Sequence, residues 1–150
     1  MKKLLKAFCM SFSMFCAIPT PFSHVWEDSV RSSHDFLTED DICEIKSQLI
    51  TSYFPNVEIY GVESGGVLAG FIGLSADKIE MLFVSTAHQG VGIGTALLTF
   101  AKDKGYELVD VNEDNPSALK FYEHNGFCIS SRDETDDAGR PFPILHLKLK

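Results

Sequence analysis

Three alternating glycines stand between a strand pattern and a helix pattern, and this segment restricts the fold more than any other feature. Gly90, Gly92 and Gly94 follow the apolar run at 79–84 and precede an amphipathic pattern at 94–104. Glycines let the backbone approach a bulky group closely, and a helix start offers N–H groups without partners and a positive dipole end. The segment predicts a strand–loop–helix unit that binds a pyrophosphate. A turn that is only flexible is the alternative.

The spacing of the glycines discriminates among phosphate-binding loops. The sequence contains no GxxxxGK[ST] segment, so it has no loop of the ATPase kind. A dinucleotide fingerprint requires GxGxxG directly after the strand, whereas here the spacing is GxGxG and residues 85–89 precede the first glycine. Asp110 could imitate the acidic ribose ligand of a dehydrogenase, but the chain is short for that class of enzyme.

Hydrophobic periodicity around the loop predicts one α/β domain, with a hairpin meander first and then strand, loop, helix and strand. Thr38, with Asp41 three residues later, resembles a capping box. Asn115-Pro116 is a strong helix start, and Gly105 is a helix stop. The expected helices lie at about 25–30, at 38–53 with an end at Pro55, at 94–104, and from 115 to 125–126. The expected strands lie at 57–62, 67–74, 79–84, 108–112, 127–129 and 144–149, with a turn at 63–66 and a polar loop at 133–140.

Composition fits one globular domain and argues against some partners. The 150 residues are 45% hydrophobic and 23% charged, and their formal net charge is −8. An acidic chain is a poor nucleic-acid binder and is compatible with a cationic amine substrate. The four cysteines form no CxxC pair and no Cys/His cluster with metal spacing, so we expect reduced thiols and no metal site. They are Cys9, Cys16, Cys43 and Cys128.

The first 22 residues differ from the rest of the chain. Three lysines precede an apolar run at 7–18, and two prolines follow it, which resembles a secretory signal peptide. The run is too short and too interrupted for a transmembrane helix, so we expect no membrane partner. Alternatively, 12–18 supplies the first strand of the domain. The sequence thus divides into a leader of uncertain role at 1–22 and a domain at 23–150.

Two motifs resemble the Gcn5-related N-acetyltransferase (GNAT) superfamily. Gln89-x-x-Gly92-x-Gly94 looks like motif A of that family, which wraps the coenzyme A pyrophosphate. The segment 115–127, NPSALKFYEHNGF, is similar to the motif that follows it. From about Val25 onward the chain also resembles the small bacterial YjaB-type acetyltransferases, as 34–37 and 139–143 show. One departure is that family members usually have a strand and a helix where this chain has its apolar leader.

The resemblance implies a GNAT-type mixed, largely antiparallel central sheet that is flanked by helices and has splayed central strands. It implies a cytoplasmic N-acetyltransferase that moves the acetyl group of acetyl-CoA to a primary amine, on a small molecule or a peptidyl lysine, by direct attack. Many relatives pair as dimers, so a homodimer is an alternative to a monomer. The other interpretation is a non-catalytic acyl-CoA-binding sensor or interaction module.

The resemblance also assigns the cofactor contacts. Main-chain groups of one strand would bind pantetheine like an added strand, and loop and helix-start residues would hold the pyrophosphate. Asn115 would contact the cofactor, or it caps a helix only. The strand residues are Leu82, Phe83 and Val84, and the loop and helix-start residues are Gln89, Gly90, Val91, Gly92, Ile93, Gly94 and Thr95.

Catalytic roles follow the same resemblance. Tyr122 stands where the family places the phenol that protonates the leaving thiolate, although packing of its ring is the alternative. Glu80 is the candidate base, acting directly or through water, but an exposed residue at a strand end would look the same. His34, Asp110 and Asn112 are candidate contacts of the acceptor, and His34 also has a suitable intrinsic pKa for proton transfer.

Overall fold

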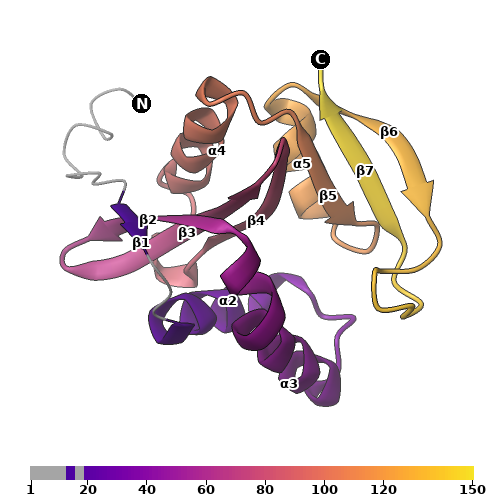
Figure 1. Ribbon diagram of the computed structural model, residues 1–150, viewed down its shortest axis with the longest axis horizontal. Helices are drawn as coiled ribbons and strands as arrows, with labels where there is room; N and C mark the ends of the chain where they lie inside the picture. The colour runs from indigo at the N-terminus through magenta and orange to yellow at the C-terminus, as the bar shows by residue number, and fades with distance from the viewer. Residues whose placement is uncertain (1–12, 16–18) are drawn as a thin grey trace.

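The computed structural model describes residues 13–15 and 19–150 and builds them around one mixed sheet (Figure 1). Its described strands follow the order β1-β2-β3-β4-β5-β7-β6. All neighbouring strands in this order are antiparallel except β4 and β5, which are parallel. The strands are β1 Ser13–Phe15, β2 Glu58–Ser64, β3 Val67–Ser75, β4 Lys78–Val84, β5 Leu108–Asn112, β6 Phe127–Asp133 and β7 Ile144–Leu149.

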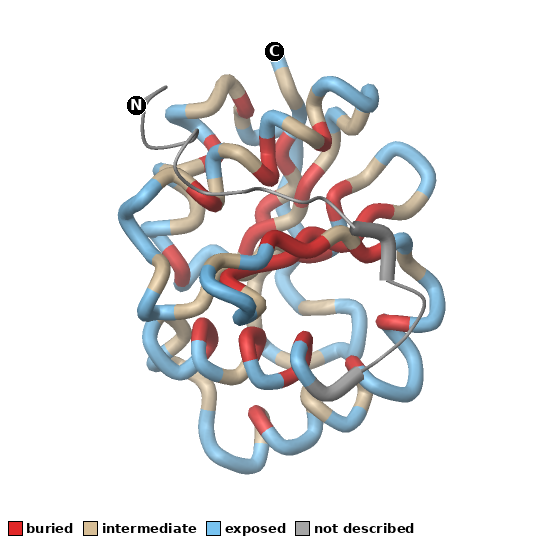
Figure 2. Tube along the Cα trace, turned by 90° about the vertical axis from the view of Figure 1, so that its left-hand side faces the viewer, coloured by how far each residue is buried: buried red, intermediate tan, exposed pale blue. Residues whose placement is uncertain are grey.

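Helices cover both faces of the sheet and create two hydrophobic cores, and Figure 2 shows buried positions along the central strands and the inner sides of the helices. In one core, side chains of α2 and α3 pack on Phe71 and Met81 of the sheet. In the other, α4 and α5 pack on the opposite face, around Leu97 and Phe127. The helices are α2 Pro19–Ser33, α3 Glu39–Gln48, α4 Ile93–Asp103 and α5 Pro116–His124.

The N-terminal segment contributes both a strand and a helix. β1 pairs with β2 at the sheet edge, from Ser13↔Gly61 to Phe15↔Ile59, within the segment for which a first strand was one alternative. α2 is longer than the sequence predicted and begins at Pro19, because proline is favoured at the first helical position, where no N–H partner is needed. The rest of the signal-like stretch, 1–12 and 16–18, lies outside the described residues.

The second helix begins as predicted but ends differently. Thr38 and Asp41 form the capping box, in which Thr38 Oγ1 accepts from Asp41 N at 3.2 Å and Asp41 Oδ2 accepts from Thr38 N at 3.0 Å. The helical path continues past α3 through a π turn, η1 Leu49–Tyr53, and a 3₁₀ turn, η2 Phe54–Asn56. Pro55 is therefore not the stop that the sequence predicted. It lies in the first positions of the last turn, which proline tolerates.

Short-range signals elsewhere are confirmed. Gly65 and Gly66 both have positive φ and connect β2 to β3, as a hairpin of primed-turn type requires. Gly105, with φ 91°, follows the end of α4, and Asn115 caps α5 ahead of Pro116. No helix among the described residues is long and apolar enough to cross a membrane.

The central strands diverge beside the glycine loop. β4 and β5 pair only through Lys78↔Leu108 and Ile79↔Val109. β3 continues to pair with β4 as far as Val84, so the rest of β4 keeps one hydrogen-bonded edge and turns its other edge toward the gap. The predicted splay of the central strands is present at the fourth and fifth positions of the sheet.

Candidate active site

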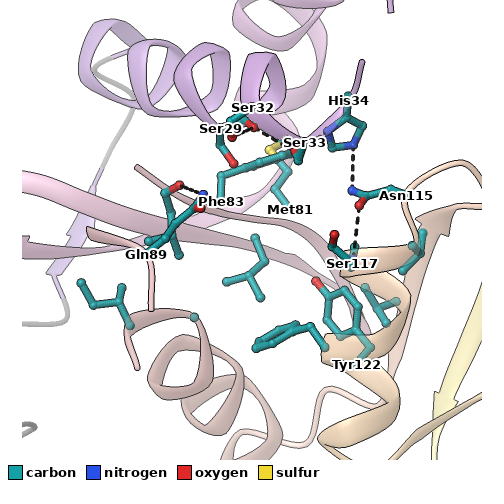
Figure 3. A pocket seen from close by; sticks show the side chains of 18 of the residues that line it. Ser29, Ser32, Ser33, His34, Met81, Phe83, Gln89, Asn115, Ser117 and Tyr122 are labelled. Carbon is teal, nitrogen blue, oxygen red and sulfur yellow. Dashed lines mark hydrogen bonds between the residues drawn. The ribbon is translucent and has the colours of Figure 1, made fainter. Parts of the chain in front are cut away.

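A cavity of about 720 Å³ occupies the gap between β4 and β5 (Figure 3). A volume of this size is within the range of small-molecule and cofactor sites. The structure brings together in its wall every site residue that the sequence suggested except Val91, which is exposed beside it. The lining residues that the sequence analysis had not singled out include Ser29, Ser33, His88, Ser117 and Phe121.

The loop before α4 is shaped to leave backbone N–H groups exposed. Gly90 and Gly92 have φ of 77° and 90°, a conformation that other residues rarely adopt, and an added Cβ would meet nothing within 4 Å at either position. Gly92 is the N-cap of α4, and no side chain of the described residues caps this helix. The amides of Ile93, Gly94 and Thr95 therefore have no helical partner, and they lie at the positive end of the helix dipole. This arrangement fits the diphosphate of a nucleotide cofactor.

α2 anchors this loop through a side chain that the sequence analysis missed. Asp28 Oδ2 accepts from Thr86 N at 2.7 Å, and Oδ1 accepts from Thr86 Oγ1 at 3.0 Å. Ser85 N donates to Ala69 O at 2.8 Å on the other side of the loop. Asp28 lies 58 residues before Thr86, so no local pattern in the sequence could have revealed the contact.

Asp28→Ala is expected to weaken coenzyme A binding by roughly tenfold, because each hydrogen bond to a charged group contributes about 1.5–3 kcal/mol and part of that loss is regained from water. Isothermal titration calorimetry with coenzyme A measures the change. Glu63→Ala, which removes an exposed carboxylate from β2 outside the cavity, is the matched control and should bind like the wild type. Equal affinity of the Asp28 variant and the wild type would exclude this role for Asp28.

Tyr122 projects from α5 into the cavity, and its phenol oxygen points toward Ser117 in Figure 3. The side chain is 7% exposed, and its ring packs edge-on against Phe121 and Phe127 at 5.2 and 5.7 Å between centroids. Burial raises the pKa of the phenol above its ordinary value. The hydroxyl makes no hydrogen bond to a described residue, and it is not sealed from solvent, because no fully buried side-chain oxygen of the described residues lacks a partner. Its raised pKa keeps it protonated at neutral pH, so it is available to a bound molecule.

His34 and Asn115 meet at the rim of the cavity. His34 Nε2 lies 3.3 Å from Asn115 Nδ2, and His34 Nδ1 lies 2.8 Å from Ser33 Oγ. Asn115 Oδ1 accepts from Ala118 N at 3.2 Å, which is the helix-cap contact that the sequence analysis considered. Burial lowers the pKa of His34, and the charge of Asp35 opposes this shift. The imidazole is therefore neutral at pH 7.

The two acidic residues of the cavity wall, Asp110 and Glu80, differ in their partners and in their exposure. Both oxygens of Asp110 have partners, because Oδ2 pairs with Lys78 Nζ and Oδ1 lies 2.6 Å from His146 Nδ1. Hydrogen bonds to Asp133 and Asp110 raise the pKa of His146. Glu80 is exposed, and its Oε1 accepts from Ser75 Oγ at 2.7 Å. Asp110 thus links β4, β5 and β7 where the sheet begins to splay, whereas Glu80 stays accessible from the cavity.

Comparison with known proteins places this geometry in a family. The family described as "Acetyltransferase (GNAT) domain" matches residues 55–129, half of the chain, including β4, the glycine loop and α5. This chain belongs to the GNAT acetyltransferase family. The family match confirms the resemblance that the two motifs showed. GNAT acetyltransferases transfer acetyl groups from acetyl-CoA, so acetyl-CoA is the acetyl donor.

Individual relatives agree with the family assignment. The GNAT chain is 34% identical to the peptidyl-lysine N-acetyltransferase YjaB of Escherichia coli (strain K12) over 125 residues, which are 82% of this chain and 84% of YjaB. The solution structure of apo YjaB from Escherichia coli matches with a TM-score of 0.83 at 30% identity, over 93% of this chain and 96% of that one. A Thermoplasma acidophilum N-acetyltransferase, PaiA, in complex with coenzyme A shares the fold at 21% identity and a TM-score of 0.63, over 93% and 99% of the two chains.

Proposed function

We propose that this GNAT N-acetyltransferase acetylates the side-chain amine of lysine in peptides or proteins. The observation that carries the proposal is a single cavity that joins the uncapped start of α4 to the Tyr122 phenol. The acceptor class is supported by the YjaB relatives, which are named peptidyl-lysine N-acetyltransferases, and by an acidic chain with Glu80 in the cavity wall.

In this proposal, main-chain groups make most of the contacts with acetyl-CoA. Amides from Gln89 to Thr95, including those of the exposed Val91, would hold the pyrophosphate, because the helix start offers donors that the protein leaves unpaired. Leu82, Phe83 and Val84 would bind pantetheine along the strand edge that β5 does not pair, as an added strand does. Asn115 Nδ2 would donate to the same molecule, since its oxygen is already used by Ala118 N.

Acetyl-CoA supplies an activated thioester, and the protein supplies one side chain that accepts a proton and one that donates a proton. As the amine nitrogen forms its bond to the acetyl carbon, the carbon–sulfur bond breaks. Glu80 would accept the proton of the amine, directly or through a water, and the Tyr122 phenol would give its proton to the sulfur. Asp110 and Asn112 on β5 and His34 at the end of α2 line the side from which the acceptor would approach.

The proposal includes a location and a domain division. We place the enzyme in the cytoplasm, where acetyl-CoA is available, with the apolar leader at 1–22 and the catalytic domain at 23–150. Because β1 Ser13–Phe15 pairs with β2 and α2 begins at Pro19, we expect the leader to stay attached to the domain. Intact-mass measurement of the protein from its native host tests the leader, since removal of about 20 residues would contradict this location. A homodimer remains a prediction, to be checked by light scattering.

An acceptor panel tests the function. We expect thiol release from acetyl-CoA with lysine-containing peptides. A peptide whose α-amine is blocked should gain one acetyl group, about 42 Da, on its lysine side chain. Free polyamines, amino acids and aminoglycosides are the comparison acceptors. If a small amine is acetylated and peptides are not, the acceptor class is wrong. If coenzyme A binds and no amine is acetylated, the chain is a binding module.

A further inference from the structure

A chain of hydrogen bonds crosses the rim of the cavity from the end of α2 to the start of α5 (Figure 3). Ser33 Oγ donates to Ser29 O at 2.9 Å and lies 2.8 Å from His34 Nδ1. On its other side, the imidazole lies 3.3 Å from Asn115 Nδ2, and Asn115 Oδ1 accepts from Ala118 N at 3.2 Å. The chain therefore connects the two halves of the enzyme that the splayed strands separate.

A backbone amide at the Asn115 end fixes the direction of the bonds there, and the Ser33 end is compatible with the same direction. The Ala118 amide is only a donor, so Asn115 presents its oxygen to it and its nitrogen to His34. The Ser29 carbonyl is only an acceptor, and it also accepts from Ser32 Oγ at 2.8 Å. When Ser33 donates its single hydroxyl proton to this carbonyl, Ser33 Oγ accepts from His34 Nδ1. The Asn115 end requires a neutral imidazole with its proton on Nδ1 and a lone pair on Nε2, and the Ser33 end accommodates the same form.

A proton on Nε2 would break the chain, because Nε2–H and the Asn115 amide would face each other as two donors. Asn115 is 6% exposed and cannot turn its oxygen to His34 without leaving the Ala118 amide unpaired. The charged group that acts on His34 is Asp35 in its own loop. Ser33 of α2, Asn115 of α5 and Phe36, which contacts the loop before β7, are not ionisable near neutral pH.

We propose that His34 is a positioning residue for acetyl transfer. Neutral His34 holds the Asn115 side chain so that one amide proton goes to Nε2 and the other remains for the bound cofactor. This inference rests on the proposed use of the cavity by acetyl-CoA. Protonation of His34 breaks its hydrogen bond with Asn115, and the Asn115 amide is then no longer held toward the cofactor. The kcat/KM for acetyl-CoA therefore falls as the pH falls.

The kinetic test measures kcat/KM for acetyl-CoA from about pH 8 down to about pH 5, through the range in which histidine titrates. Wild type should show an acidic limb that lies below the ordinary histidine pKa, because burial lowers the pKa of His34. His34→Gln keeps an acceptor near the Nε2 position and cannot be protonated, so its activity should be about threefold lower and independent of pH. His34→Leu should lose roughly tenfold at pH 8 through a higher KM for acetyl-CoA. His124→Gln, an exposed histidine on the same helix as Asn115, should keep the wild-type limb.

A spectroscopic test needs no turnover. Imidazole ¹⁵N chemical shifts of the wild type should report a neutral His34 with its proton on Nδ1. A proton on Nε2 at pH 7, or a wild-type acidic limb in His34→Gln, would overturn the proposal. If the ¹⁵N result holds and no amine is acetylated by the wild type, the proposed function fails and the positioning of Asn115 stands.

Discussion

Tyr122→Phe is expected to lower kcat by roughly 100-fold or more, which is the usual contribution of a positioned general acid. The affinity for coenzyme A should change less than about twofold, because the ring keeps its packing against Phe121 and Phe127. The lost hydroxyl has no partner among the described residues, so its removal leaves no buried group unsatisfied. Thiol-release kinetics and calorimetry with coenzyme A separate the two quantities.

Tyr60→Phe is the matched control. Tyr60 packs against Phe100 at 4.8 Å between centroids with the rings tilted by 60°, and its hydroxyl donates to Glu58 Oε2 at 3.3 Å, outside the cavity. This substitution removes the same atom from a tyrosine that we give no catalytic role, and kcat should stay at the wild-type value. Unchanged turnover in Tyr122→Phe would remove Tyr122 from the role of acid and leave it as a packing residue.

The raised pKa of Tyr122 is compatible with this role and predicts the form of the pH profile. Burial disfavours the phenolate, and the same walls would surround the departing thiolate and increase its proton affinity too. The proton affinities of the phenolate and the thiolate therefore rise together, and proton transfer between them stays feasible although the phenol is a weaker acid than in water. Because the phenol must be protonated and its pKa is raised, kcat should show no loss from its ionisation up to about pH 10.

Sequence reasoning succeeded where the signal is local. Gly65-Gly66, the Thr38 capping box and Asn115-Pro116 each specify a turn or a helix start through their own backbone preferences, and the structure has each of them. The glycine loop was predicted for the same reason, since positive φ and an uncapped helix start are properties of a few neighbouring residues.

Sequence reasoning failed where the cause lies far away or carries no hydrophobic pattern. β6 runs to Asp133 rather than Ile129, because its polar second half pairs with β7 and leaves no apolar alternation in the sequence. The contact of Asp28 with Thr86, in the loop before α4, forms only when α2 packs beside that loop, so the local sequence does not reveal it. The partners of Asp110 were also hidden, since Lys78 and His146 reach it from strands that adjoin β5 only in the sheet.

Gly92→Glu is expected to weaken coenzyme A binding by about 100-fold or more. The new side chain has open space around its Cβ, so no steric clash with the protein is expected, and we attribute the loss of affinity to a carboxylate at the proposed site of the pyrophosphate. At about 4 Å, two like charges repel by about 4 kcal/mol near a protein surface, and salt screens part of this. Calorimetry at low and high ionic strength measures both effects, and a wild-type affinity would refute the assignment of the loop.

Backbone strain is the competing explanation, and the chain provides a control for it. Gly105 has φ of 91°, against 90° for Gly92, and an added Cβ there also meets nothing within 4 Å. Gly105→Glu therefore introduces the same charge and the same left-handed strain, of order 1–3 kcal/mol, at the far end of α4. Both variants should lose similar free energy of unfolding, but only Gly92→Glu should lose the cofactor. Equal losses of affinity would mean that strain in α4, rather than charge at its start, controls binding.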